Sequence, residues 1–296
     1  MALISSKPLG TLIRVADSDN GNGAANYEIA DINNLVPGGV VLVRKNIYSN
    51  SQFGSNTNYP NGTLDNLIKT TIYNEMPQKL RDKMMDVSFS LYTFSGSEDI
   101  TRKMFALTKT MAGLGNNGNV EEGKALQLYT SNASRKKTFN GSAANWWLSS
   151  PNASEYAWGV NSGGAAYNYD FTSRSNGVVP AFAIPQSVML EDGANTDGSY
   201  NIKYAEKISC TINMGSTEEQ PKAALPIISC NGNLTLKICN NANDANPAWE
   251  TAVNETVHNF ANTTKTAAQW AIGLKIDITR TAGESLFLNE PVVLTM

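Results

Sequence analysis

Apolar and polar residues alternate with a period of two along much of the chain, which is typical of strands with one buried face. The alternation is most regular in the last third, where Ile208, Cys210 and Ile212 are followed by similar sets at 234–238 and 270–278. Shorter apolar runs in the first third predict four more strands, at residues 12–15, 27–32, 40–44 and 87–94.

Three other segments have the apolar spacing of short helices. Leu64, Leu67 and Ile68 predict a first helix that continues to about Tyr73. Residues 76–85 predict a second helix with Pro77 near its first turn, and residues 98–107 predict a third, entered through Ser97. Beyond them we expect three strands joined by polar loops, at 146–148, 156–160 and 177–184.

A cluster of turn-forming residues, Glu-Asp-Gly-Ala-Asn-Thr-Asp-Gly-Ser at 191–199, predicts a linker. We therefore expect a first domain at residues 1–190. Residues 200–296 are expected to form a separate β-sandwich, since they have the size and strand pattern of such a domain.

The amino-acid composition argues against nucleic-acid binding and membrane insertion. Hydrophobic residues make up 41% of the chain and charged residues only 17%, while 35 residues are Asn, so much of the polar surface must consist of uncharged amides and hydroxyls. A net charge of -3 argues against nucleic acid as a partner. No apolar run approaches the roughly 20 residues that span a bilayer, so membrane insertion is not expected. The first residues lack the pattern of a secretion signal, and we expect synthesis in the cytoplasm.

Little in the sequence indicates catalysis, and we expect neither enzyme activity nor a cofactor. The only histidine, His258, stands in a predicted strand, and no Gly-x-Ser-x-Gly motif is present. The cysteines Cys210, Cys230 and Cys239 have no metal-ligand spacing and are expected to be free thiols, although one disulfide among them stays possible. The segment 17–22 alternates oxygen-bearing side chains, but it lacks the closing Glu of a calcium loop, so no metal site is expected.

Three ordered motifs carry a resemblance to a known family. They are Asn145-Trp146-Trp147-Leu148-Ser149-Ser150-Pro151, Ala157-Trp158-Gly159-Val160-Asn161-Ser162-Gly163-Gly164 and Asn176-Gly177-Val178-Val179-Pro180-Ala181-Phe182. They resemble the "WWLRSP … GVRPAF" series of bacterial and phage modules with the C-type-lectin fold, over roughly residues 8–186. The chain departs from the series at Ser149 and Val179, where the family commonly has Arg. Segment 249–272 is similar to the β-sandwich tails of phage structural proteins.

The resemblance implies the fold class: an α+β C-type-lectin-like domain followed by an all-β, immunoglobulin-like sandwich. Relatives include retroelement-diversified phage receptor-binding proteins, calcium-dependent sugar binders and formylglycine-generating oxidases. The oxidases need paired cysteines in this domain, yet none precedes Cys210, and the sugar binders' Glu-Pro-Asn and Trp-Asn-Asp motifs are absent from residues 1–186. The functions that remain for this domain are display of a binding surface and a purely structural role.

The polar-aromatic segment between the apolar blocks supplies the candidate surface. Tyr and Trp offer a large contact area at low entropy cost, and Ser, Gly and Asn offer adaptable hydrogen bonds. We expect Trp146, Trp147, Trp158 and Phe182 to be core. The candidate ligand-binding residues are Asn152, Ser154, Glu155, Tyr156, Tyr167, Tyr169, Asp170, Phe171 and Arg174.

These features predict a bacteriophage virion protein on the particle surface, in a head decoration, tail or baseplate. Its expected partners are other virion proteins, further copies of itself, and a cell-surface glycan or protein. A capsid decoration protein without an external ligand and a bacterial surface adhesin remain alternatives.

Overall fold

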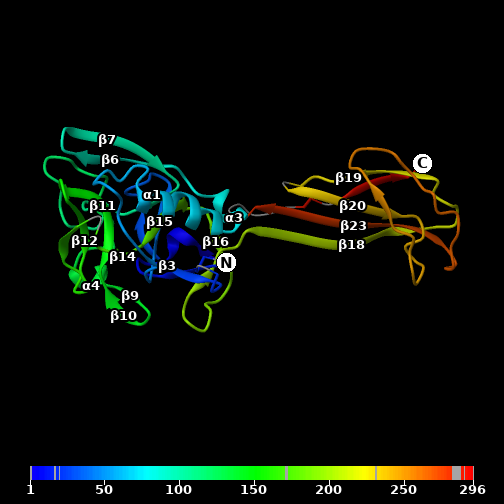
Figure 1. Ribbon diagram of the computed structural model, residues 1–296. Helices are drawn as coiled ribbons and strands as arrows, with labels where there is room; N and C mark the ends of the chain where they lie inside the picture. The colour runs from blue at the N-terminus through cyan, green and yellow to red at the C-terminus, as the bar shows by residue number, and fades with distance from the viewer. Residues whose placement is uncertain are drawn as a thin grey trace. The chain divides into compact units, whose positions relative to one another are not determined.

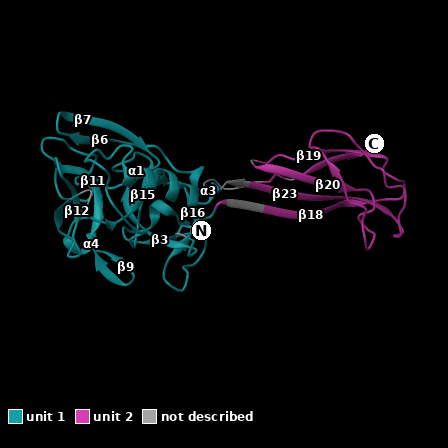
Figure 2. Cartoon of the chain, viewed as in Figure 1, with its two compact units in different colours: residues 1–203 teal, residues 204–296 magenta. Residues whose placement is uncertain are grey.

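The computed structural model of the protein describes residues 2–16, 18–19, 21–170, 173–230, 232–281, 288–289 and 291–295 (Figure 1). The chain divides into two compact units, Met1–Lys203 and Tyr204–Met296, called unit 1 and unit 2 below (Figure 2).

Unit 1 is built around a six-stranded sheet. In spatial order its strands are β17 (Tyr200–Asn201), β2 (Leu12–Val15), β3 (Ala25–Ile32), β4 (Gly39–Arg44), β15 (Pro180–Pro185) and β8 (Met104–Ala106). Every residue of β4 is buried, and so are the first five of β15. Both faces of these strands are covered, which is why residues 40–43 form an unbroken apolar run and do not alternate.

A second sheet of unit 1 has five strands. In spatial order they are β13 (Ala166–Asp170), β12 (Tyr156–Val160), β11 (Trp146–Ala153), β14 (Asn176–Gly177) and β5 (Asn50–Ser51). Three two-stranded pairs complete the unit: β1 (Ala2–Leu3) with β16 (Met189–Leu190), β9 (Lys137–Phe139) with β10 (Ser142–Ala144), and β6 (Val87–Thr93) with β7 (Gly96–Arg102).

The helices are few and short. One helix runs continuously from α1 (Thr63–Asn66) through the π-helical stretch η2 (Leu67–Ile72) to α2 (Tyr73–Glu75). Its buried residues Leu64, Ile68 and Ile72 recur every four positions, which confirms the first predicted helix. The second predicted helix is reduced to α3 (Gln78–Arg81). The remaining helical turns are η1 (Ile4–Ser6) and α4 (Asn132–Arg135).

The third predicted helix, at residues 98–107, is wrong. Its first half is strand β7, which pairs along its whole length with β6, and its second half contains β8. The hairpin turns at Phe94 and Ser95, and Gly96, the first residue of β7, adopts a φ of 146°, a conformation that other residues rarely reach. Within β7 only Ile100 is buried, so the segment carries too few apolar residues to show the period of a strand.

Unit 2 consists of strands in two sheets. The first has the order β18 (Ala205–Thr217), β23 (Trp270–Thr281), β20 (Asn233–Cys239) and β21 (Glu250–Ala252), and the second has β22 (His258–Asn259), β19 (Ala223–Ile227) and β24 (Val292–Thr295). One core joins them: Leu236, Leu274 and Ile276 from the first sheet pack with Ala224 and Val293 from the second. The strands predicted from period-2 alternation in this part are confirmed.

The expected fold class, an α+β C-type-lectin-like domain followed by an immunoglobulin-like sandwich, is wrong. Strands account for 44% and helices for 9%, and the strands are distributed over several small sheets. One helix of 13 residues does not provide the helical layer of an α+β domain, and the segments expected to add helices pair as strands or remain single turns.

The segment expected to be a linker, residues 191–199, folds back onto unit 1. The N–H of Asn195 donates to the Ser199 carbonyl at 2.7 Å, and Ser199 is buried. Directly afterwards, β17 pairs in parallel with β2. The turn residues thus form a loop that returns to the sheet, and the division between the units follows Lys203.

Candidate binding surface on strands β11 to β13

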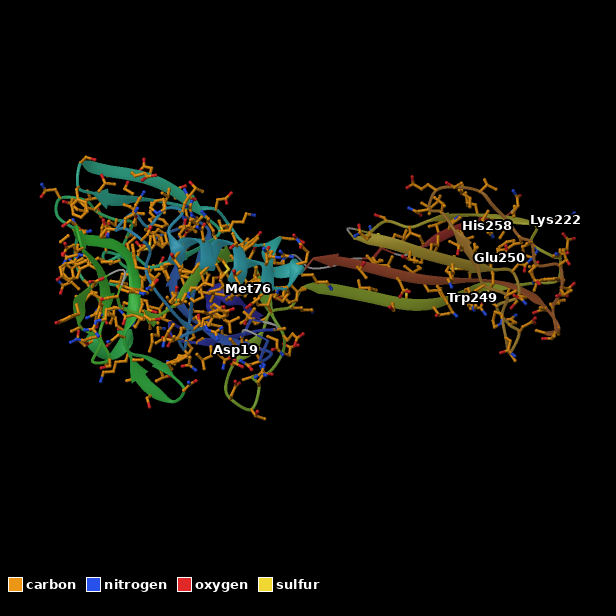
Figure 3. All side chains as sticks on the ribbon, in the orientation of Figure 1. Asp19, Met76, Lys222, Trp249, Glu250 and His258 are labelled. Carbon is orange, nitrogen blue, oxygen red and sulfur yellow. The ribbon has the colours of Figure 1, made fainter. Side chains whose placement is uncertain are left out.

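The residues with catalytic potential make structural contacts. His258 lies in β22, as predicted, and its Nε2 is 3.0 Å from an Oε2 of Glu250 (Figure 3). The Glu250 carboxylate also accepts the N–H groups of Ala261 and Asn262. Burial raises the pKa of Glu250, but these hydrogen bonds outweigh it and hold the pKa below its ordinary value. Among the described residues, no group of three or more His, Cys, Asp or Glu could hold a metal ion.

The three cysteines are free. Cys239 is fully buried, whereas Cys210 and Cys230 are half-buried. In the part of the chain that the structure describes, no helix is both long and apolar enough to cross a membrane.

Strands β12 and β13 place the predicted tyrosines on two faces of the five-stranded sheet. In their antiparallel register Ala157 lies opposite Tyr169, and Gly159 opposite Tyr167. Because successive side chains of a strand point to opposite faces, Tyr167 and Tyr169 lie on one face and Tyr156 on the other. The predicted binding residues therefore do not form one continuous surface.

Tyr167 begins a row of aromatic rings that leads from the surface into the core. Ring centroids are 5.0 Å apart for Tyr167 and Tyr169, 5.7 Å for Tyr169 and Trp147, 5.6 Å for Trp147 and Phe53, and 6.2 Å for Phe53 and Tyr59. Tyr167 is 54% exposed, whereas the last three rings are buried. Burial and the neighbouring Tyr167 raise the pKa of Tyr169 to about 12. The two contacts of Trp147, with Tyr169 and with Phe53, are edge-to-face, a geometry that favours fixed ring orientations.

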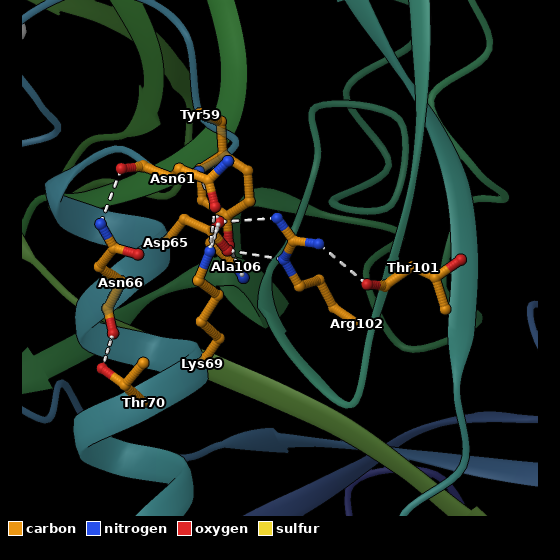
Figure 4. Close-up of polar contacts among 9 residues, drawn as sticks. All are labelled: Tyr59, Asn61, Asp65, Asn66, Lys69, Thr70, Thr101, Arg102 and Ala106. Atoms are coloured by element: carbon orange, nitrogen blue, oxygen red, sulfur yellow. Dashed lines mark hydrogen bonds and ion pairs between the residues drawn. The ribbon is translucent and has the colours of Figure 1, made fainter.

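A buried ion pair fixes the inner end of this row (Figure 4). The Asp65 carboxylate accepts hydrogen bonds from Arg102 Nε at 2.9 Å and Nη2 at 2.8 Å, and from Lys69 Nζ at 3.1 Å. The backbone N–H of Asn61 donates to the same carboxylate at 2.8 Å. These contacts join Asp65 of α1 to Arg102 of β7 and to Asn61, which lies two residues after Tyr59. The Tyr59 hydroxyl accepts the N–H of Ala106 at 3.0 Å.

The opposite face of the sheet carries Tyr156 and Trp158. Tyr156 is 40% exposed. Trp158, expected to be core, is only half-buried: its Nε1 donates to Asn117 Oδ1 at 3.1 Å, and the Lys109 Nζ lies 4.6 Å from its ring centroid. Trp146, Trp147 and Phe182 are fully buried, as predicted.

The other predicted binding residues lie at the ends of these strands. Ser154 and Glu155 are exposed in the turn between β11 and β12, beside the half-buried Asn152. Asp170 is half-buried at the end of β13, where its Oδ1 accepts the N–H of Ser173 at 2.9 Å; Arg174 is exposed. Phe171 lies outside the described residues.

The buried carboxylate of Glu122 links strand β11 to strand β6 through hydrogen bonds. Glu122 is fully buried and accepts the N–H of Tyr92 at 2.9 Å and a short hydrogen bond from the Ser150 hydroxyl. Burial raises the pKa of Glu122 above its ordinary value. The same network includes Asn117, whose amide donates to the Pro151 carbonyl at 2.6 Å. The hairpin β11–β12 and the hairpin β6–β7 are thereby tied to one polar centre.

The tip of hairpin β6–β7 adds residues that the sequence did not indicate as binding residues. A cavity of about 600 Å³ lies between this tip and Pro151, immediately before the predicted residue Asn152. Tyr92 and Phe94 line it with ring centroids 5.7 Å apart, and Phe94 is 54% exposed. An apolar residue beside Ser95-Gly96 is a signal for an exposed hairpin tip, but Phe94 was expected to be the last residue of a strand.

Comparison with known proteins assigns this region to a family. The sequence pattern of the family described as a domain of unknown function, DUF6273, matches residues 37–186, about half of the chain. The chain belongs to the DUF6273 family. The matched region contains β11, β12, β13 and the hairpin β6–β7, and unit 2 lies outside it. No curated protein and no solved structure matches the chain.

Proposed function

We propose that this DUF6273 protein is a bacteriophage virion protein on the particle surface, and that unit 1 binds a ligand on the host cell through the tyrosines of β12 and β13. The aromatic row from Tyr167 to Tyr59 is the observation that supports ligand binding by unit 1. Its outer member, Tyr167, is 54% exposed although its ring rests on Tyr169, which in turn contacts buried Trp147.

An exposed ring with a supported orientation is suited to binding. A tyrosine that is ordered before it meets its partner loses little further conformational freedom on association. Its ring supplies apolar contact area, and its hydroxyl can donate and accept hydrogen bonds. Tyr156 offers the same chemistry from the opposite face of the sheet, so the edge of the sheet at β13 presents aromatic groups on both sides.

The virion assignment rests on the sequence. The Trp146–Pro151 and Asn176–Phe182 motifs resemble phage and bacterial modules, and the chain combines few charges with many amides and hydroxyls. In this proposal unit 2 attaches the protein to other virion proteins or to further copies of itself. Its strand β24 supports that role with two exposed apolar side chains, Val292 at 49% and Leu294 at 50%.

Two experiments test the proposal. Negative-stain microscopy of virions labelled with an antibody against residues 1–186 should show label on the particles, and absence of the protein from particles would favour a bacterial adhesin. In a cell-binding assay the full chain should adhere to host cells, and Tyr156→Ala with Tyr167→Ala should weaken adhesion at least 10-fold, about the effect of losing two contact residues.

The control for the cell-binding assay is Val253→Ala in unit 2, which truncates an apolar side chain that is more exposed (66%) than either tyrosine and lies far along the chain. This variant should adhere like the unchanged protein. A protein that is present on virions but does not adhere to host cells would be a decoration protein without an external ligand.

A further inference from the structure

Unit 1 contains a second cavity that shares no lining residue with the candidate surface on β11 to β13. Its volume is about 530 Å³, and it lies between the start of β3, the segment that follows β4, and the hairpin β9–β10. Cavities that hold small molecules commonly have volumes of about 300–1,000 Å³. The size therefore suits a ligand of one or two sugar rings.

The lining is rich in uncharged hydrogen-bonding groups. The lining residues include four asparagines, Asn22, Asn26, Asn46 and Asn140, and two hydroxyl-bearing residues, Ser49 and Thr138. Tyr48 and Phe139 supply aromatic surface. Amides offer a donor and an acceptor side by side, which matches neighbouring hydroxyl groups of a sugar, and an aromatic ring can pack against a sugar's C–H face.

The cations of the lining already have carboxylate partners. Arg44 pairs with Asp19, and its Nη1 donates to the Ser18 carbonyl at 2.5 Å. Lys45 Nζ lies 2.6 Å from Glu28, whose other oxygen is 2.6 Å from the buried Lys137. The cavity therefore has no unpaired positive charge among these cations that would select an anionic ligand.

The amide of Asn26 is oriented by a residue outside the lining: its Nδ2 donates to an Asp197 oxygen at 2.9 Å, and a carboxylate only accepts. The Asn26 Oδ1 and the Arg44 Nε have almost no accessible surface, so neither atom faces the cavity. The polar groups that remain for a ligand include the amides of Asn46 and Asn140 and the hydroxyls of the lining.

We propose that this cavity binds a neutral saccharide of one or two units through the amides of Asn46 and Asn140. The inference goes beyond the function proposed above, because it concerns different residues and does not require a virion. Asn46 Oδ1 accepts the Thr138 hydroxyl at 2.9 Å, so its amide nitrogen is the group that faces a ligand's acceptor.

The test measures binding of glucose, galactose, mannose and N-acetylglucosamine to the full chain by saturation-transfer-difference NMR. At least one sugar should bind, and Asn46→Asp should weaken it about 3- to 10-fold, the effect of one lost hydrogen bond. This variant keeps an acceptor for Thr138 and replaces the amide donor with a charged oxygen that only accepts. Asn140→Gly removes a second amide and keeps the backbone, because Asn140 has a φ of 51° and glycine adopts that conformation readily.

Tyr167→Ala separates this proposal from the preceding one: it should leave sugar binding unchanged even where it abolishes adhesion to cells. Absence of binding for all four sugars would mean that ordered water alone fills the cavity, and the proposal would be overturned. Equal binding by the unchanged chain and by both variants would also overturn it. Displacement of the sugar by inorganic phosphate would show that the site selects anions, which contradicts a neutral ligand.

Discussion

The ring of Tyr169 packs directly over Gly159, with no room between them for a side chain. A Cβ on Gly159 would lie 2.9 Å from two carbons of the Tyr169 ring and 2.7 Å from the Trp146 carbonyl oxygen. Tyr169 holds Tyr167 on one side and contacts Trp147 on the other, so this close approach sets the position of the whole aromatic row.

Gly159→Ala should therefore disturb both stability and binding. The backbone oxygen of Trp146 cannot move without displacing β11, and overpacking of this kind typically costs about 1–3 kcal/mol. We expect a loss of that size in the free energy of unfolding, measured by urea denaturation, together with weaker adhesion to host cells.

Gly163→Ala is the matched control. An added Cβ there would meet only the side-chain oxygen of Asn161, at 3.1 Å, and Gly163 is exposed. Its free energy of unfolding should stay within about 0.5 kcal/mol of the unchanged protein. If the two alanine variants unfold alike, the close packing of Tyr169 on Gly159 has no energetic consequence.

Phe94→Ala should weaken binding and leave stability nearly unchanged. Phe94 is 54% exposed at the tip of hairpin β6–β7, and it lines the cavity next to Pro151. Truncating an exposed side chain usually changes stability by less than about 0.5 kcal/mol. If the ligand extends from Tyr156 into this cavity, adhesion should fall several-fold, as a cell-binding assay would show. Full adhesion by this variant would limit the binding surface to β12 and β13.

Local pattern in the sequence was sufficient for most of the longer strands and for the helix at Thr63–Glu75. Period-2 alternation at 208–212, 234–238 and 270–278 marks strands with one buried face, and each of them is present. Strand β6 was predicted, but its partner β7 could not be found in this way. In β7 only Ile100 is buried, and the segment becomes a strand because β6 pairs with it along its whole length.

The geometry of the candidate surface depends on information that no single segment carries. Strand β13 was expected to be a loop, although Tyr167 and Tyr169 alternate with polar residues. Which face each tyrosine occupies follows from the register of β13 on β12, which places Tyr169 opposite Ala157. The sequence of either strand alone does not determine that register. The tip residue Phe94 reaches the neighbourhood of Pro151 through tertiary packing.

The reactivity of the three cysteine thiols with a thiol reagent should reflect how closely unit 2 is packed around them. Cys239 is fully buried, and burial raises its pKa, so both access and thiolate formation are disfavoured. We expect a thiol reagent to leave Cys239 unmodified in the native protein and to modify all three cysteines in urea. Cys239→Ala should lower the count in urea to two and leave the native count unchanged. Fewer than three thiols in urea without a reductant would contradict free cysteines.

Acid should weaken unit 1 through Asp65. Burial raises the pKa of its carboxyl, but the hydrogen bonds from Arg102, Asn61 and Lys69 outweigh burial and hold the pKa below the ordinary value. The unfolded chain, with a pKa of about 3.9 for Asp, then binds a proton more readily than the folded chain. The stability that Asp65 contributes is therefore present above about pH 4 and is lost as the pH falls through the folded pKa.

Asp65→Asn should remove this dependence. The variant leaves the partly buried Arg102 and Lys69 without their carboxylate, and breaking a buried pair in this way costs about 3–5 kcal/mol at neutral pH. Urea unfolding at pH 7 and pH 3 should then show a smaller difference for the variant than for the unchanged protein. Glu155→Gln, which changes an exposed carboxylate, should unfold like the unchanged protein at pH 7. If the variant and the unchanged protein lose equal stability between pH 7 and pH 3, the acid sensitivity arises from other groups. The inner end of the aromatic row would then depend on packing alone.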